Sequence, residues 1–383
     1  MQFSTKCIHG DGQRFAGDNT GAVSVPIYQT ATYAHPEAGK STGYDYSRLQ
    51  NPTREQLEKV VACLEGGVDA LAFSSGMAAI AALMELFSPG DNIICDCDLY
   101  GGTVRLFDNI TSKNGVTVTR ADCSSQDIAG LIAKNTRAVY IETPTNPMMN
   151  VIDIAALAKI TRQKGILLIV DNTFLSPYFQ NPLSLGADVV VHSGTKFLGG
   201  HNDALAGFLV VNSNELSEKL RFIIKTVGSG LAPFDSWLVL RGIKTLPVRM
   251  EKSQQNAIAI AKYLQSESKV TKVYYCGIEG GKGYEITKRQ ARGFGSMITF
   301  EVESRALALH ILKSVKLIRF AESLGGVETL ITYPFTQTHA DVPEDLRIKN
   351  GITDRVLRLS AGIEDAADLI FDLKQAIDST PSL

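Results

Sequence analysis

The sequence of 383 residues has no strong excess of charge of either sign. Its 38 lysines and arginines are balanced by 40 aspartates and glutamates, which gives a formal net charge of -2. Proteins that bind nucleic acid or anionic membranes usually concentrate positive charge on one surface. We therefore expect neither nucleic acid nor a membrane as a partner.

Long hydrophobic runs are also missing, and cysteines are few. We find no uninterrupted apolar segment long enough to cross a bilayer, and the opening residues MQFSTKCIHG lack the apolar part of a secretion signal. Of the six cysteines only Cys95 and Cys97 lie close together, and they are spaced by one residue instead of the two of a C-x-x-C motif. We expect a cytoplasmic protein with reduced thiols and no metal site.

Two common phosphate-binding motifs are absent. No G-x-G-x-x-G sequence follows an apolar segment, which weakens a dinucleotide-binding interpretation. Residues 34–42 (AHPEAGKST) resemble the end of a Walker loop, but Ala34 replaces its first glycine and Pro36 interrupts it. We treat that similarity as chance.

The dominant pattern is an alternation of short apolar segments with helical ones. Thr53 and Gln56 predict a capping box for a helix that ends near Gly66 and Gly67. Further helices are expected at 76–87, 102–113, 125–134, 153–164, 214–228 and 248–265, separated by segments such as DALAFSS, NIICDC, AVYIETP and ILLIVDN. This alternation is typical of an α/β fold with a mainly parallel sheet covered by helices on both faces.

The length and the pattern divide the chain into three parts. Residues 1–47 are irregular and glycine-rich, as expected of an arm that contacts another subunit. Residues 48–241 carry the alternation, and residues 242–383 predict a smaller α/β domain. A chain of 383 residues is long for one hydrophobic core, which favours this two-domain arrangement.

Polar residues follow each predicted strand. In an open parallel sheet, ligands bind beyond the carboxyl ends of the strands. The residues expected at this edge are Ser74, Ser75, Gly76, Tyr100, Glu142, Asn146, Asp171, Ser193, Thr195 and Lys196. The junction of Ser75 and Gly76 predicts either a phosphate site at a helix N-terminus or simply a helix capped by Ser75.

Two charged residues at this edge need an explanation. Asp171 ends the apolar segment ILLIVDN, so it is either a turn aspartate or the partner of a cation such as a protonated pyridine nitrogen. Lys196 follows ADVVVHSGT and is either a surface lysine or an amine that its surroundings make nucleophilic. A phosphate site, a carboxylate, an aromatic ring and an amine together favour pyridoxal 5'-phosphate as cofactor.

Eight segments then carry a resemblance to a known family. YDYSRLQNPTR, SSGMAA, DLYGGTVRLF, ETPTNP, VDNTF, HSGTKFLGGHND, AESLGGVETL and RLSAGIED resemble, in order and spacing, the trans-sulfuration family of pyridoxal-phosphate enzymes. That family includes cystathionine γ-synthase, γ-lyase, β-lyase and methionine γ-lyase. The resemblance covers nearly the whole chain and implies a fold-type I enzyme, with a large cofactor-binding domain and a smaller C-terminal α/β domain.

The resemblance also implies roles for individual residues. Lys196 is expected to bind the cofactor covalently and to act with Tyr100 in catalysis, with Asp171 on the ring nitrogen and Tyr100 on the ring face. The remaining cofactor-binding residues implied by it are Gly76, Met77, Thr173, Ser193, Thr195 and, reaching the phosphate of a neighbouring subunit, Tyr46 and Arg48. Its implied substrate-binding residues are Asn146, Glu322, Ser323 and Arg358.

The expected activity is cleavage of the carbon–sulfur bond of cystathionine and related thioether amino acids. Glu322 resembles family members that act at Cγ, whereas residues 228–245 are closer to β-lyases, and Gly102 departs from the cysteine usual in methionine γ-lyases. The alternatives are a γ-synthase that uses O-acylhomoserine and cysteine, an aminotransferase, or a non-catalytic cofactor-binding protein. Shared sites imply a homo-oligomer of at least two subunits, and the family suggests a tetramer.

Overall fold

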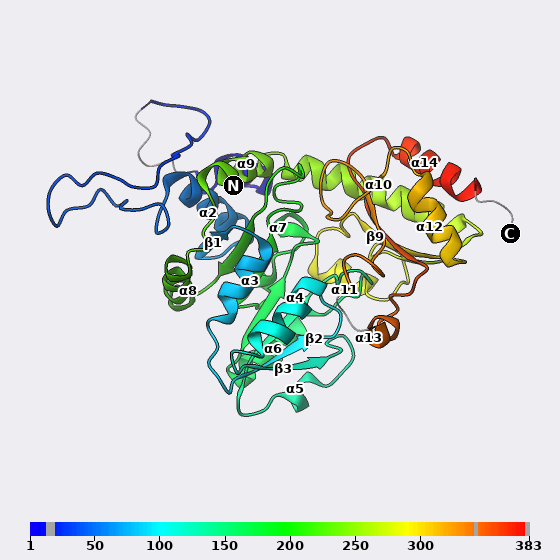
Figure 1. The fold of residues 1–383 in the computed structure, drawn as a ribbon, viewed down its shortest axis with the longest axis horizontal. Helices are drawn as coiled ribbons and strands as arrows, with labels where there is room; N and C mark the ends of the chain where they lie inside the picture. Colours follow the sequence, from blue (N-terminus) through cyan, green and yellow to red (C-terminus); the bar gives the residue numbers. More distant parts are fainter. Residues whose placement is uncertain (13–19, 341–343, 380–383) are drawn as a thin grey trace.

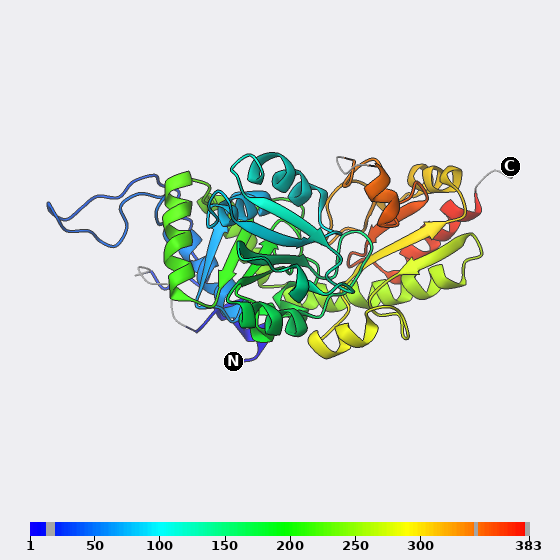
Figure 2. The same ribbon diagram turned by 90° about the horizontal axis from the view of Figure 1, so that it is seen from below.

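The computed structural model describes residues 1–12, 20–340 and 344–379. Part of the predicted N-terminal arm therefore lies outside the described residues. The chain begins with α1 (Phe3–His9), and a long loop before α2 (Pro52–Glu65) projects from the body in both views (Figures 1 and 2). An isolated bridge between Thr32 and Tyr46 joins the two sides of this loop.

A seven-stranded sheet forms the larger part of the molecule. Its strands are β1 (Asp69–Phe73), β2 (Asn92–Asp96), β3 (Thr117–Ala121), β4 (Thr136–Glu142), β5 (Leu167–Asp171), β6 (Val189–Ser193) and β7 (Gly207–Val211). They lie in the order β1-β7-β6-β5-β4-β2-β3, and only β7 runs antiparallel to its neighbours. The prediction of a mainly parallel sheet is confirmed.

Alternate residues of these strands face opposite helical layers. On β1, Ala70 and Ala72 pack with residues of α2 and α9 (Pro233–Ile243), while Leu71 and Phe73 pack with α3 (Gly76–Met84) and α8 (Asn214–Val227). The short α5 (Ile128–Leu131) and α6 (Ile154–Lys164) cover the strands β4 and β5. Both faces of the sheet are therefore buried, which explains why its strands are apolar on both sides.

Several predicted helix boundaries are wrong for local reasons. The N-cap of α2 is Asn51, whose side chain accepts from the backbone N–H groups of Thr53 and Arg54, so the capping box at Thr53 is not formed. The helix expected at 76–87 ends at Met84, and the one at 125–134 is reduced to α5. The helix expected at 102–113 is α4 (Gly101–Leu106) followed by a π-helical turn, η1 (Phe107–Thr111).

A second sheet of five strands lies on the other side of the molecule. Its strands are β8 (Val270–Tyr274), β9 (Met297–Val302), β10 (Arg319–Phe320), β11 (Leu330–Thr332) and β12 (Val356–Ser360), in the order β10-β11-β12-β9-β8. Only β10 and β11 are parallel. The helices α10 (Leu246–Ser266), α12 (Arg305–Ser314) and α14 (Ala366–Asp378) enclose its core.

Short elements complete the described part of the chain. They are α7 (Ser176–Phe179), the 3-10 turn η2 (Pro182–Leu185), α11 (Tyr284–Gln290) and α13 (Glu344–Lys349). No helix of the described residues has the length and apolar character needed to cross a membrane. The predicted domain boundary at residue 242 falls within the last turn of α9 and stays a prediction.

Candidate active site

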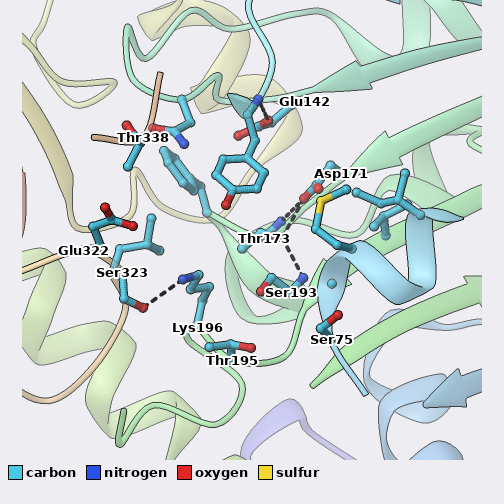
Figure 3. A pocket seen from close by; sticks show the side chains of 18 of the residues that line it. Ser75, Glu142, Asp171, Thr173, Ser193, Thr195, Lys196, Glu322, Ser323 and Thr338 are labelled. Atoms are coloured by element: carbon cyan, nitrogen blue, oxygen red, sulfur yellow. Dashed lines mark hydrogen bonds between the residues drawn. The ribbon is translucent and has the colours of Figure 1, made fainter. Parts of the chain in front are cut away.

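A cavity of about 350 Å³ opens at the carboxyl ends of β4, β5 and β6. Its other wall comes from Arg358 of the second sheet and from the loop before β11, which carries Glu322 and Ser323 (Figure 3). Of the fourteen residues predicted for the site, twelve line it: Gly76, Met77, Tyr100, Asn146, Asp171, Thr173, Ser193, Thr195, Lys196, Glu322, Ser323 and Arg358. Residues far apart in sequence are thus brought to one place, as expected from their positions just after the predicted strands.

Strand register places the polar residues at the cavity. Glu142 at the end of β4 pairs with Asp171 at the end of β5, and Asp171 pairs with Val191 of β6. Ser193 ends β6 opposite Gly207 of the antiparallel β7. Because neighbouring strands end at the same level, their last side chains and the turns that follow share one edge.

The N-terminus of α3 forms one end of the cavity. The Ser75 side chain accepts from the backbone N–H of Ala78, so the predicted cap is present, and Gly76 and Met77 begin the helix at the cavity wall. A Cβ atom at Gly76 would lie 3.1 Å from the Ser193 Cβ. The N–H groups of the first helical turn have no partner within the helix and favour an anion. Because a larger residue at position 76 would crowd Ser193, glycine leaves room for a phosphate group beside these N–H groups.

Asp171 is held in one orientation by its neighbour. Thr173 donates to Asp171 Oδ1 from its hydroxyl, at 2.6 Å, and from its backbone N–H, at 3.0 Å, and its Oγ1 accepts from the Ser193 backbone N–H at 2.9 Å. Burial raises the pKa of Asp171, while the hydrogen bonds from Thr173 oppose that rise. A buried carboxylate of this kind is stabilised most by a cation or a strong donor inside the cavity.

The Lys196 amine lies across the cavity from Asp171 (Figure 3). Its Nζ donates to the Ser323 hydroxyl at 2.8 Å. Burial, and next the positive charge of Arg358, lower the pKa of Lys196 from 10.5 to about 8, against the opposing charge of Glu322. The amine is therefore much closer to its neutral, nucleophilic form at neutral pH than an exposed lysine is.

Arg358 is a buried cation on β12 and only 2% exposed, which excludes a surface salt bridge. Its Nη1 donates to Asn146 Oδ1 at 2.8 Å and its Nη2 donates to the Ser323 carbonyl at 2.9 Å. Ser323 has a φ of 93°, a left-handed conformation that non-glycine residues rarely adopt. These contacts fix a guanidinium beside the amine, where it can pair with a carboxylate.

Two predicted residues lie outside the cavity. Tyr46 is 44% exposed, and the Arg48 guanidinium lies 5.5 Å from the centre of the Tyr46 ring. Arg48 also donates to the backbone carbonyl of Lys225 at the end of α8. Their predicted contact with the phosphate site of another subunit is not tested by a single chain.

The structure adds residues that the sequence did not assign. Glu142, placed at the sheet edge but given no role, accepts from the Tyr100 backbone N–H at 3.0 Å and so helps to fix that tyrosine. Burial, and next the charge of Asp171, raise the pKa of Glu142. Thr338 enters the cavity from an irregular loop whose sequence gives no periodic signal, whereas Glu142 could have been found from its position after β4.

This arrangement fits pyridoxal phosphate. A buried amine, a buried carboxylate opposite it and a glycine at a helix N-terminus match the aldehyde, the ring nitrogen and the phosphate of that cofactor. Lys196, Asp171 and Gly76 are therefore the residues that would hold these three groups.

Comparisons with known proteins agree with this fit. Residues 4–378 match the model of the family described as "Cys/Met metabolism PLP-dependent enzyme". The chain is 49% identical over 381 residues to cystathionine gamma-lyase of Bacillus subtilis, covering 99% of this chain and 100% of that protein. It is 48% identical over 375 residues to cystathionine beta-lyase of Lactococcus lactis, covering 98% of each.

A solved structure is similar over the same extent. The crystal structure of cystathionine gamma synthase from Xanthomonas oryzae in complex with cystathionine superposes with a TM-score of 0.95 at 37% identity, covering 99% of this chain and 98% of that one. The predicted fold-type I architecture is confirmed. The chain belongs to the Cys/Met metabolism family of pyridoxal-phosphate-dependent enzymes.

Proposed function

We propose that this enzyme is a carbon–sulfur lyase that cleaves cystathionine and related thioether amino acids. The observation that carries the proposal is the pairing of Lys196 and Arg358 on either side of Ser323. An amine suited to proton transfer and a guanidinium suited to binding a carboxylate are therefore both held by one residue, Ser323. Relatives with about half of their residues identical are named as lyases of cystathionine.

The cofactor and the protein divide the chemistry. When bound, pyridoxal phosphate withdraws electrons and so stabilises negative charge at the Cα atom of an amino acid. Once a substrate amine has displaced it from the cofactor, the Lys196 amine would serve as the base that takes the Cα proton, because its lowered pKa leaves part of it neutral near pH 7. Asp171 would keep the ring nitrogen protonated, since its carboxylate is buried and oriented by Thr173.

The substrate is oriented by side chains that line the cavity. Arg358, with Asn146 and Ser323, binds the α-carboxylate beside Lys196. Tyr100 lines the cavity with a partly exposed ring, which would lie against the cofactor, and its phenolate form would take a proton from the incoming amine. Glu322 lies beyond Ser323 and attracts the distal ammonium group of cystathionine (Figure 3).

A γ-synthase is the second candidate, supported by the similarity to the synthase from Xanthomonas oryzae. Purified enzyme with L-cystathionine separates the possibilities. Cysteine with 2-oxobutyrate means γ cleavage, and homocysteine with pyruvate means β cleavage. Release of neither keto acid, together with turnover of an O-acylhomoserine and cysteine, would overturn the lyase proposal. Keto-acid release without an added amino acceptor also excludes an aminotransferase.

We also propose that the enzyme is a homo-oligomer, a tetramer of two dimers, whose N-terminal arm (residues 1–47) completes a neighbouring site. Support comes from the exposed side chain of Tyr46 and from the loop that projects beyond α8. Six free cysteines support a reducing, cytoplasmic location. Sedimentation of the wild-type enzyme tests the tetramer. Activity of mixed Arg48→Ala and Lys196→Ala proteins tests the shared sites, because recovery of activity on mixing requires sites built from two chains.

A further inference from the structure

A second cavity, of about 800 Å³, lies beside the active-site cavity. We name it the distal groove and define it by Arg319, Asp203, Asn202 and Glu328, which line it but not the active-site cavity. The two cavities share Thr195, Leu205, Glu322 and Ser323. A ligand held at Lys196 can therefore extend past Glu322 into the distal groove.

Arg319 is the only cationic residue among the described residues that line the distal groove. Its side chain makes no ion pair or side-chain hydrogen bond with any other described residue, and it is exposed. Asp203, Glu322 and Glu328 give the same groove three carboxylates. Opposite charges at separate places in one groove suit a zwitterion and not a simple anion or cation.

The groove is held in shape by its backbone. Arg319 pairs in register with Leu330 across β10 and β11, and both residues line the groove. On the facing wall, Asn202 adopts a φ of 54° and its Nδ2 donates to Glu328 Oε2 at 2.7 Å. A Cβ atom at Gly326 would lie 2.2 Å from Asn202 Nδ2, so a larger residue there would displace the Asn202 side chain from this position. The charges are thus presented by constrained segments.

We infer that Arg319 is a specificity residue that binds the distal carboxylate of a substrate carrying a second α-amino acid group. Glu322, Asp203 and Glu328 form the complementary site for its ammonium. This inference rests on the proposed function and deepens it, because it distinguishes substrates with two amino acid ends from S-alkyl amino acids. Arg319 does not line the cavity of the reacting atoms, so its effect falls on binding and not on the chemical step.

The test uses two non-cleavable ligands and equilibrium titration of the holoenzyme. L,L-2,7-diaminosuberate replaces the sulfur of cystathionine by a methylene and keeps both amino acid ends. L-2-Aminoheptanoate keeps one end and ends in a methyl group. Neither contains a carbon–sulfur bond, so their dissociation constants do not depend on which bond the enzyme cleaves or on whether it is a lyase.

In Arg319→Gln we expect the dissociation constant of diaminosuberate to rise about fivefold to tenfold, with that of aminoheptanoate unchanged. Arg319→Lys keeps the charge and should recover part of the loss. Lys316→Gln, which removes an exposed cation three residues earlier, is the matched control and should change neither constant.

Equal changes for both ligands, or no change for diaminosuberate, would overturn the inference. Steady-state kinetics provides a second readout: Arg319→Gln should raise KM for cystathionine with kcat unchanged, and leave KM for S-propyl-L-cysteine and S-ethyl-L-homocysteine as it is. If the wild-type enzyme releases no keto acid, the proposed lyase activity fails while the titration still decides the role of Arg319.

Discussion

Capture of pyridoxal phosphate by Lys196 is expected to depend on pH with a midpoint near 8. Only the neutral amine attacks the cofactor aldehyde, and burial with the nearby Arg358 lowers the pKa of Lys196 from 10.5 to about 8. At pH 7 the neutral fraction therefore rises from about 0.03% to about 10%, roughly 300-fold. Below pH 8 the rate constant should rise about tenfold for each pH unit, and above it should level off.

The assay is stopped-flow absorbance of cofactor-free enzyme mixed with pyridoxal phosphate between pH 6 and 10. The rate constant of Nα-acetyl-lysine amide, measured in parallel, removes the pH dependence of the aldehyde itself. Arg358→Gln removes the charge that disfavours the ammonium form, so its midpoint should move upward, whereas Arg358→Lys should stay near the wild type.

The control is Arg355→Gln, which changes a half-buried arginine paired with Glu301 outside the cavity and should leave the profile unchanged. A wild-type midpoint at pH 10 or above would refute the argument from burial. An unchanged midpoint in a correctly folded Arg358→Gln protein would refute the argument from charge.

Three further changes test other parts of the site. Asp171→Asn should lower kcat by roughly 10²- to 10³-fold with the cofactor still bound, and a smaller loss would exclude the ring-nitrogen role. In Gly207→Ala the new Cβ would lie 2.1 Å from the Ser75 carbonyl oxygen, so urea unfolding should show a loss of about 1–3 kcal/mol and cofactor affinity should fall. Burial, and next the charge of Arg358, lower the pKa of His339, which contacts the Asn146 carbonyl, to about 4. The unfolded chain therefore binds a proton that the folded one does not, and stability should fall by up to about 3 kcal/mol as pH drops from about 6.5 to about 4. His339→Asn should flatten this dependence; equal slopes would contradict it.

The strand ends could be predicted from sequence because each apolar segment is short and is followed at once by a polar residue. Asp171 and Ser193 were placed in this way, and the register of β5 and β6 puts them at one edge. Arg358 sits inside an apolar strand, VLRLS, where a charge has to be compensated. Its partner Asn146 was expected at the sheet edge from the strand pattern, whereas the substrate-binding role of Asn146 and the whole assignment of Ser323 came from the family resemblance.

Other features depend on contacts that one segment does not encode. Asn51 caps α2 because its side chain is also held by the Tyr28 carbonyl, which lies 23 residues earlier. Thr338 reaches the cavity from a loop without regular structure, and a Cβ at Gly101 would meet its carbonyl oxygen at 2.4 Å. The distal groove combines Asn202 with Glu328, and nothing in either local sequence indicates that pairing.

The central claim is that the Lys196 amine is the covalent attachment point of the cofactor. Borohydride reduction of the cofactor-loaded enzyme makes that bond permanent, and mass spectrometry of the digested protein then identifies the modified side chain. We predict that the added pyridoxyl mass lies on the peptide that contains Lys196, and that Lys196→Ala protein is unmodified. Modification of a different lysine in the wild type, or of none, would contradict the account.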